Sequence, residues 1–187
     1  MSAVKLCIAA TIAIAFVHAR PAPGPQGPTP AVIQKNEGER RIRRPRTTAI
    51  ASSTFVIKVS PQVNGSKHLL VGYEEVPPGA MIPKHKHHGE EEILLLQTGT
   101  AHVWLGEKEF DAQPGAIVFI PPETSISLKN TGTDNINLTF VFNEPGFEEM
   151  LRCASVAYGA AAPPMSQQDV VACYQHGDAE LAPVAAR

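Results

Sequence analysis

Between residues 54 and 143 the apolar residues follow a strand-like rhythm, and no segment of this stretch shows a helical period. Runs rich in Val, Ile, Leu and Phe are interrupted by turn residues, a pattern typical of an all-β sandwich or barrel. The pattern predicts strands over residues 54–59, 68–76, 81–87, 92–99, 100–105, 108–112, 116–120, 125–130 and 136–142.

After Pro145 the pattern becomes helical. Within residues 145–159, Phe147, Leu151 and Val156 fall near one face of a predicted helix. Ser166 and Asp169 resemble a capping box, which predicts a second helix through about Tyr174. Residues 144–187 are therefore expected to form a short C-terminal helical extension and tail that covers one edge or mouth of the barrel.

The N-terminal segment, residues 1–19, has the pattern of a secretory signal. Lys5 precedes an apolar run from Leu6 to Val17, and the small residue Ala19 marks the predicted cleavage site. The run is shorter than the roughly 20 residues needed to cross a bilayer. A buried helix is the alternative, but an all-apolar helix followed at once by Arg20 and Pro21 has nothing to pack into. We therefore expect a secreted or periplasmic protein without a transmembrane segment.

Residues 20–53 are rich in Pro, Gly and Arg and lack an apolar period, which predicts a flexible leader. The arginines of residues 38–46 could contact an anionic surface, but a solvated basic tail is the preferred interpretation. No aromatic residue is interleaved with them and no nucleic-acid motif follows, so nucleic acid is not an expected partner. The length of 187 residues and the 43% hydrophobic content suit one domain.

Two cysteines remain after the predicted cleavage, Cys153 and Cys173. An even pair in an oxidising compartment could form a disulfide. Two buried free thiols fit the sequence equally well, because cysteine is commonly buried without pairing.

The candidate chemistry lies in residues 85–92. His85 and His87 are two residues apart, so on a strand both imidazoles point to one face. Glu92 follows a turn and can return on the neighbouring strand to meet them. Two imidazoles and one carboxylate form a facial set that suits one divalent ion of Fe, Mn, Ni or Zn. A solvated surface patch of balanced charges is the alternative.

Further residues could replace members of this set. His88 should face the opposite side of the strand, although the turn at Gly89 can relax that parity. His102 on a later strand could approach the cavity. Glu90 and Glu91 are alternatives to Glu92 if the turn is shorter.

The glycine framework around these residues resembles the first motif of the cupin superfamily. Gly79, His85, His87, Glu92 and Gly99 stand at the family spacing, although Glu91 would fit a shorter ligand spacing. In a second motif Gly115, Pro121 and Asn130 match, whereas Glu123 stands where a glycine is usual. The resemblance implies a single-domain cupin of the type-2 kind. Its fold would be a double-stranded β-helix, or jelly-roll barrel, over residues 54–143.

Ile126 is the departure that matters. Metal-binding cupins usually carry a third histidine at this position, and isoleucine offers no lone pair. The resemblance therefore implies three protein ligands, His85, His87 and Glu92, and an apolar wall beside them. Leu94 and Leu96 share the parity of Glu92 and should extend that wall.

The expected function is that of a metal-dependent enzyme acting on a small organic molecule, in the form of a dioxygenase-like oxidoreductase. Isomerase and decarboxylase activities are less favoured. The alternative is a non-catalytic module that binds a small apolar or sugar-like ligand, with weak or no metal binding. The strand over residues 54–59 is a candidate exposed edge that a homodimer would cover.

Overall fold

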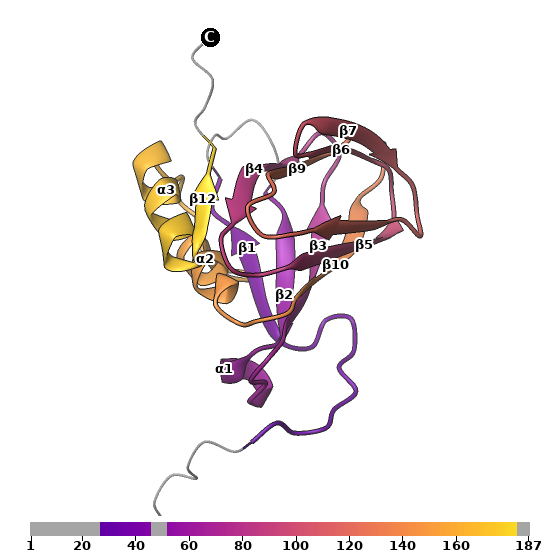
Figure 1. The fold of residues 1–187 in the computed structure, drawn as a ribbon. Helices are drawn as coiled ribbons and strands as arrows, with labels where there is room; N and C mark the ends of the chain where they lie inside the picture. The colour runs from indigo at the N-terminus through magenta and orange to yellow at the C-terminus, as the bar shows by residue number, and fades with distance from the viewer. Residues whose placement is uncertain (1–26, 46–51, 183–187) are drawn as a thin grey trace, which may run out of the picture.

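Strands are the main regular secondary structure in the computed structural model, which describes residues 27–45 and 52–182 (Figure 1). The strands are β1 (Glu39–Arg43), β2 (Thr54–Val59), β3 (Leu70–Val76), β4 (Met81–His87), β5 (Glu92–Thr98), β6 (Ala101–Leu105), β7 (Lys108–Ala112), β8 (Ile117–Ile120), β9 (Ile126–Asn130), β10 (Ile136–Phe142), β11 (Ser155–Ala157) and β12 (Ala179–Leu181). The helices are α1 (Pro61–Asn64), α2 (Phe147–Cys153) and α3 (Gln167–His176).

These strands form two antiparallel sheets that enclose the core. One sheet has the order β11-β1-β2-β3-β10-β5-β8, and the other has the order β12-β4-β9-β6-β7. Along β10 every second side chain is buried, as expected for a strand with one face on the core. The all-β jelly-roll prediction is confirmed, and each strand predicted between residues 54 and 142 is present within two residues of its expected bounds.

A glycine on β3 allows an aromatic ring of the neighbouring strand to pack closely. A side chain at Gly72 of β3 would place its Cβ 2.0 Å from the Phe140 ring on the neighbouring β10. The bare backbone of Gly72 therefore makes room for Phe140, which helps line the cavity described below.

The leader prediction is wrong for Glu39–Arg43. These residues form β1, which pairs with β2 on one side and β11 on the other. The strand is stable despite its charges because its arginines find partners far away in the sequence. Arg41 donates to Ser155 Oγ, and Arg43 pairs with Glu74. Residues 39–43 of the basic segment are thus part of the larger sheet and not a solvated tail.

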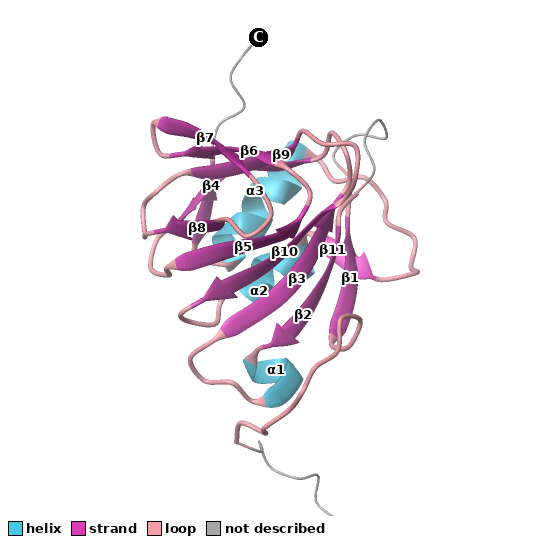
Figure 2. Cartoon of the chain, turned by 90° about the vertical axis from the view of Figure 1, so that its right-hand side faces the viewer, coloured by secondary structure: helices cyan, strands magenta, loops and turns pink. Residues whose placement is uncertain are grey.

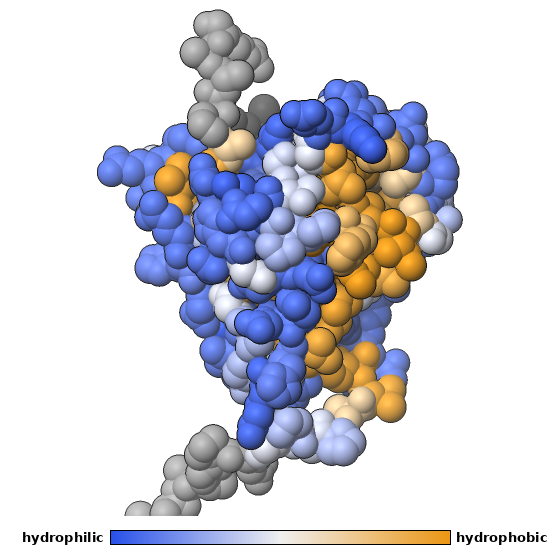
Figure 3. Space-filling view, viewed as in Figure 1, coloured by the Kyte–Doolittle hydropathy of each residue, from blue (hydrophilic) through white to orange (hydrophobic). Residues whose placement is uncertain are grey.

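The predicted edge strand is also wrong. Residues 54–59 form β2, whose two neighbours are β1 and β3, so the edges of this sheet are β8 and β11. The edge strand β8 exposes two large apolar side chains, Ile117 and Phe119. Figure 3 shows apolar residues gathered along one side of the molecule, beside a largely hydrophilic surface. Homodimerisation stays a prediction, but residues 54–59 are not the surface for it.

The C-terminal extension is helical only in part. The helix predicted over residues 145–159 ends at Cys153, and Ser155–Ala157 form β11 because β1 offers them backbone partners. The capping box of α3 is confirmed: Ser166 Oγ accepts the Asp169 N–H, and the Asp169 carboxylate accepts the Ser166 N–H. Within residues 54–143, α1 is a short helix that the sequence pattern did not predict.

Helices α2 and α3, together with β12, form what we call the cap. In Figure 2 the two sheets form an upper and a lower layer, and α2 and α3 lie behind the opening between them. A disulfide joins Cys153 of α2 to Cys173 of α3, with 5.4 Å between their Cα atoms. Strand β12 then pairs with β4, where Ala179 lies opposite His87 and Leu181 opposite His85. A disulfide therefore cross-links the two helices of the cap, and strand pairing joins the cap to the strand that carries the two histidines.

Residues 1–19, for which a signal segment is predicted, lie outside the described residues. Among the helices that the structure describes, none has the length and apolar character needed to span a membrane.

Candidate metal centre

Strand β4 presents both histidines to the interior of the barrel. His85 and His87 are 5% and 1% exposed, and Lys86 between them points outward to Glu123. Pro83 cannot donate a hydrogen bond to the ladder, and the register of β4 with β9 shifts between Ile82 and His85. The Pro83 carbonyl lies 2.7 Å from His85 Nδ1. An Nδ1–H donor in this contact leaves the lone pair of the imidazole on Nε2.

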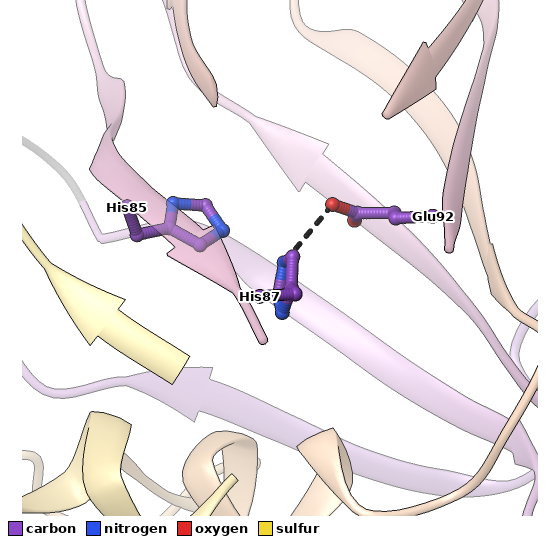
Figure 4. A group of neighbouring side chains, drawn as sticks. All are labelled: His85, His87 and Glu92. Carbon is purple, nitrogen blue, oxygen red and sulfur yellow. Dashed lines mark ion pairs between the residues drawn. The ribbon is translucent and has the colours of Figure 1, made fainter. Parts of the chain in front are cut away.

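Glu92 approaches from the opposite sheet. It is the first residue of β5, directly after the turn that leads from β4, and it is 6% exposed. Figure 4 shows the three side chains converging, with His87 Nε2 3.2 Å from Glu92 Oε2. One nitrogen or oxygen atom from each of His85, His87 and Glu92 lies within 4.8 Å of the others. The structure thus brings the three predicted ligands together, with donors from both sheets.

Aromatic rings surround the two imidazoles. The Phe147 ring of α2 lies 4.5 Å from the His87 ring centroid at 84° and 6.0 Å from that of His85 at 7°. Phe142 contacts His87 from the other side at 5.0 Å, and Tyr174 of α3 lies 5.3 Å from His85. The rings of the cap therefore hold both imidazoles in place and shield them from water.

His87 gives the clearest indication that the site is suited to a metal ion. Its contact with Glu92 lacks hydrogen-bond geometry, and both ring nitrogens are buried without a hydrogen-bond partner among the described residues. Such unpaired buried polar atoms cost about 1–3 kcal/mol each, so a protein keeps them where something else uses them. The 3.2 Å separation suits two donors that share an ion about 2.1 Å from each. The donor set fits a divalent transition-metal ion.

A small cavity adjoins these donors. It is lined by His85, Glu92, Leu94, Ile126 and Phe140, together with Arg43, Glu74, Ile82, Phe142, Phe147, Met150, Leu151 and Tyr174. Its free volume for the centre of a water molecule is about 20 Å³, enough for one water-sized occupant. Ile126 pairs with His85 in the β4–β9 register and forms the predicted apolar wall. Leu94 also lines the cavity, whereas Leu96 is buried in the core and does not reach it.

His88 faces away from the site. Its Nδ1 lies 2.6 Å from the Glu123 carboxylate on the outer surface. Glu123 replaces the glycine of the second motif, and its φ of 62° explains why glycine is usual there. Its backbone N–H donates to the His87 carbonyl at 2.7 Å, so this loop supports the β4 strand from outside.

Glu90 and Glu91, the alternative carboxylate ligands, do not belong to the set that converges with the two histidines. Glu91 is exposed, and its backbone N–H is held by the Asn143 side chain. Glu90 is buried, and burial raises the pKa of its carboxyl group above the ordinary value. One of its oxygens has no hydrogen-bond partner among the described residues.

His102 lies on the outer face of β6. Its Nδ1 is 2.8 Å from Asp111 and its Nε2 is 3.1 Å from Glu109, both on β7. The hydrogen bond with Asp111, followed by that with Glu109, raises the pKa of His102 above the ordinary value of 6.5. The structure therefore places His102 in a surface ion-pair cluster away from the cavity.

This cluster gives a pH prediction. We expect NMR titration to show a His102 pKa above 6.5 and a decrease toward 6.5 in Asp111→Asn. Because the folded-state pKa is raised, the stabilising contribution is complete below the unfolded-state pKa and is lost as the pH rises through the folded-state value. An unchanged His102 titration in Asp111→Asn would show that this contact does not persist in solution.

Arg43 is the cavity residue that sequence patterns do not reveal. It lies in a basic run without apolar period, and only the pairing of β1 with β2 brings it to the barrel interior. The aromatic residues of the cap, Phe147 and Tyr174, were likewise predicted only as helix positions. No local signal links them to the histidines, because the contact depends on how the cap folds back.

Comparison with known proteins agrees with the fold. Residues 72–142 match the family model described as a cupin domain. The structure is similar to a predicted oxalate decarboxylase from Thermotoga maritima, with a TM-score of 0.51 and 23% identity over 62% of this chain and all of that one. It is also similar to a sugar phosphate isomerase of the cupin superfamily from Silicibacter pomeroyi. The TM-score with the Silicibacter pomeroyi protein is 0.53, and the two sequences are 17% identical over 62% of this chain and 77% of the other.

A curated relative shares part of the sequence. Mannose-1-phosphate guanylyltransferase of Salmonella typhimurium is 32% identical over 76 residues, which is 41% of this chain but 16% of that protein. The match thus spans a small part of the relative's length. The family match and the fold together show that the chain contains a cupin domain over residues 72–142, which confirms the resemblance. The matched residues 72–142 exclude strand β1 with its Arg43, strand β11 and the cap.

Proposed function

We propose that this protein is a metal-dependent cupin enzyme that acts on a small organic molecule as a dioxygenase-like oxidoreductase. The observation that carries the proposal is the buried set of His85, His87 and Glu92, in which both His87 nitrogens have no hydrogen-bond partner among the described residues. A divalent ion held by this set would supply Lewis acidity and open coordination positions for small ligands.

The residues around the set exclude water and orient the donors. Ile126, Leu94 and Phe140 form an apolar wall, so polar interactions inside the cavity are little screened by solvent. The Pro83 carbonyl fixes the tautomer and the orientation of His85. Phe142 and Phe147 hold the His87 ring between them, which keeps its nitrogens directed at Glu92.

Oxygen consumption tests this activity. Iron(II)-loaded protein is expected to consume oxygen with some member of a panel of phenols and diketones, and His87→Ala to abolish the consumption. His88→Ala provides the matched control, because it removes the adjacent imidazole from the outer surface. A protein that binds iron but consumes no oxygen with any panel member would contradict the dioxygenase proposal.

Sugar binding is the second candidate. The sequence match to a mannose-1-phosphate guanylyltransferase and the fold match to a sugar phosphate isomerase favour a sugar-like ligand. In that case the iron-loaded protein would consume no oxygen, and mannose 1-phosphate would raise its melting temperature. The two measurements together separate the candidates.

Restoring the fourth ligand should strengthen metal binding. Ile126 lies opposite His85 and lines the cavity, so Ile126→His is expected to raise metal affinity by at least about tenfold. The same change should lower the stability of the metal-free protein by about 1–3 kcal/mol, because it buries a polar ring in place of an apolar side chain. Isothermal titration and chemical denaturation measure the two effects. If Ile126→His binds the metal ion no more tightly than the parent protein, the ion does not bind beside residue 126.

We further propose that the protein is secreted or periplasmic. The N-terminal pattern of Lys5 and the apolar run supports this location, and the disulfide between Cys153 and Cys173 suits an oxidising compartment. Expression of the full chain followed by N-terminal sequencing of the exported protein is expected to find Arg20 as the first residue. Retention of the intact chain in the cytoplasm would contradict the proposal.

A further inference from the structure

Besides the candidate ligand set, the cavity contains an ion pair between Arg43 and Glu74. Arg43 comes from β1, outside the matched cupin domain, and its side chain lines the same cavity as His85 and Glu92. Glu74 on β3 is 2% exposed and also accepts a 2.7 Å hydrogen bond from Ser53 Oγ. The cavity therefore contains the candidate ligand set and, beside it, a fixed guanidinium group.

The geometry of the pair leaves part of the guanidinium available. Arg43 donates through Nε and Nη2 to the two Glu74 oxygens, at 2.9 and 3.0 Å. This side-on contact uses two of the five N–H groups. Nη1 makes no hydrogen bond within the described residues, so the end-on fork of Nη1 and Nη2 can donate to a second carboxylate. The guanidinium carbon Cζ lies over the Phe55 ring, 5.0 Å from its centroid, so this ring also contacts the guanidinium group.

The charges of the lining groups favour an anion. Arg43 and Glu74 neutralise each other, and Glu92 offsets only half the charge of a divalent ion. With neutral imidazoles the loaded cavity keeps one excess positive charge among apolar walls, where an uncompensated charge is costly. A ligand that carries one negative charge would remove this cost.

We propose that Arg43 is the anion anchor of the cavity and that the ligand of the site is a small organic acid. One carboxylate of the acid binds the free fork of Arg43, and a second oxygen reaches the position enclosed by His85, His87 and Glu92. This inference rests on the proposed metal site and narrows its substrate class. The free volume of about 20 Å³ suits one water-sized occupant, so an organic acid enters only when Phe147 and Tyr174 of the cap move aside.

The test uses cobalt(II)-loaded protein, because the visible absorption of cobalt responds to ligands near the ion. Glycolate, which has one carboxylate and one hydroxyl group, is titrated as the probe, and glycolamide is its uncharged counterpart. We expect glycolate to shift the cobalt spectrum at concentrations at which glycolamide has no effect.

Arg43→Lys is the deciding variant. A lysine can still neutralise Glu74, which preserves the fold, but it lacks the second fork, so glycolate should bind at least tenfold more weakly. Arg40→Met is the matched control, since Arg40 lies on the same strand but is exposed and stacks on Tyr158. Cobalt content is measured for every variant by elemental analysis.

Two results would overturn the proposal in different ways. If cobalt is bound and glycolate binds Arg43→Lys as tightly as the parent protein, Arg43 is a structural partner of Glu74 and nothing more. If the parent protein holds no cobalt in the cavity, the metal-site proposal fails and the anchor fails with it. A glycolate affinity that falls in Arg43→Lys but not in Arg40→Met supports the anchor.

Discussion

Replacement of Cys153 and Cys173 by serine together is expected to lower the free energy of unfolding by about 3 kcal/mol. The bond closes a loop between residues 20 positions apart, and chain-entropy arguments assign about 3 kcal/mol to a loop of this length. Urea denaturation of the oxidised parent protein and the double serine variant measures the difference. Reduction of the parent protein should give the same shift as the double variant.

The same change should make the metal site more accessible. The disulfide joins α2, which carries Phe147, to α3, which carries Tyr174, and both rings pack against the imidazoles. Without the bond, local opening of the cap costs less free energy, so a chelator should remove the ion faster under native conditions. Equal removal rates for the oxidised and disulfide-free proteins would show that the cap does not control access.

His87→Leu is expected to abolish metal binding and to stabilise the metal-free protein. Loss of a partner that merely orients a ligand already lowers metal affinity by 10- to 100-fold, so loss of His87 itself should lower it by at least about 100-fold. Both His87 nitrogens are buried without a hydrogen bond among the described residues. An apolar side chain in their place should therefore raise the stability of the metal-free protein by about 1–2 kcal/mol.

The control for this prediction is His88→Leu. His88 is exposed and pairs with Glu123, so its loss should leave metal affinity unchanged. Isothermal titration with zinc and denaturation in the presence of a chelator give the two quantities. If His87→Leu destabilises the metal-free protein by several kcal/mol, His87 is a core residue with unrecognised partners and not a retained ligand.

The sequence predicts the barrel well because the signal is local. Most strands from β2 to β10 alternate or are continuously apolar, and turn residues separate one from the next. The spacing of His85 and His87 also sets their common face without any knowledge of the tertiary structure. Glu92 follows from the return of the chain after a short turn. These features need only the period of a strand.

The sequence does not predict β1, because its stability depends on residues far away. Arg43 is held by Glu74, and Arg41 is held by Ser155, more than one hundred positions later. The helical pattern of residues 145–159 is overridden in the same way, since Ser155–Ala157 add to β1 as a strand. The packing of Phe147 against His87 also depends on how the cap folds back. All three are tertiary effects that no local period can reveal.

One measurement tests the metal site most directly. Crystals of protein reconstituted with zinc or manganese can be examined by anomalous scattering at the absorption edge of the metal. We predict one peak per chain inside the barrel, within bonding distance of His85, His87 and Glu92, and no peak in crystals of His87→Leu. Absence of a peak in the barrel of the reconstituted parent protein, or a peak only at the surface cluster of His102, Glu109 and Asp111, would contradict the account.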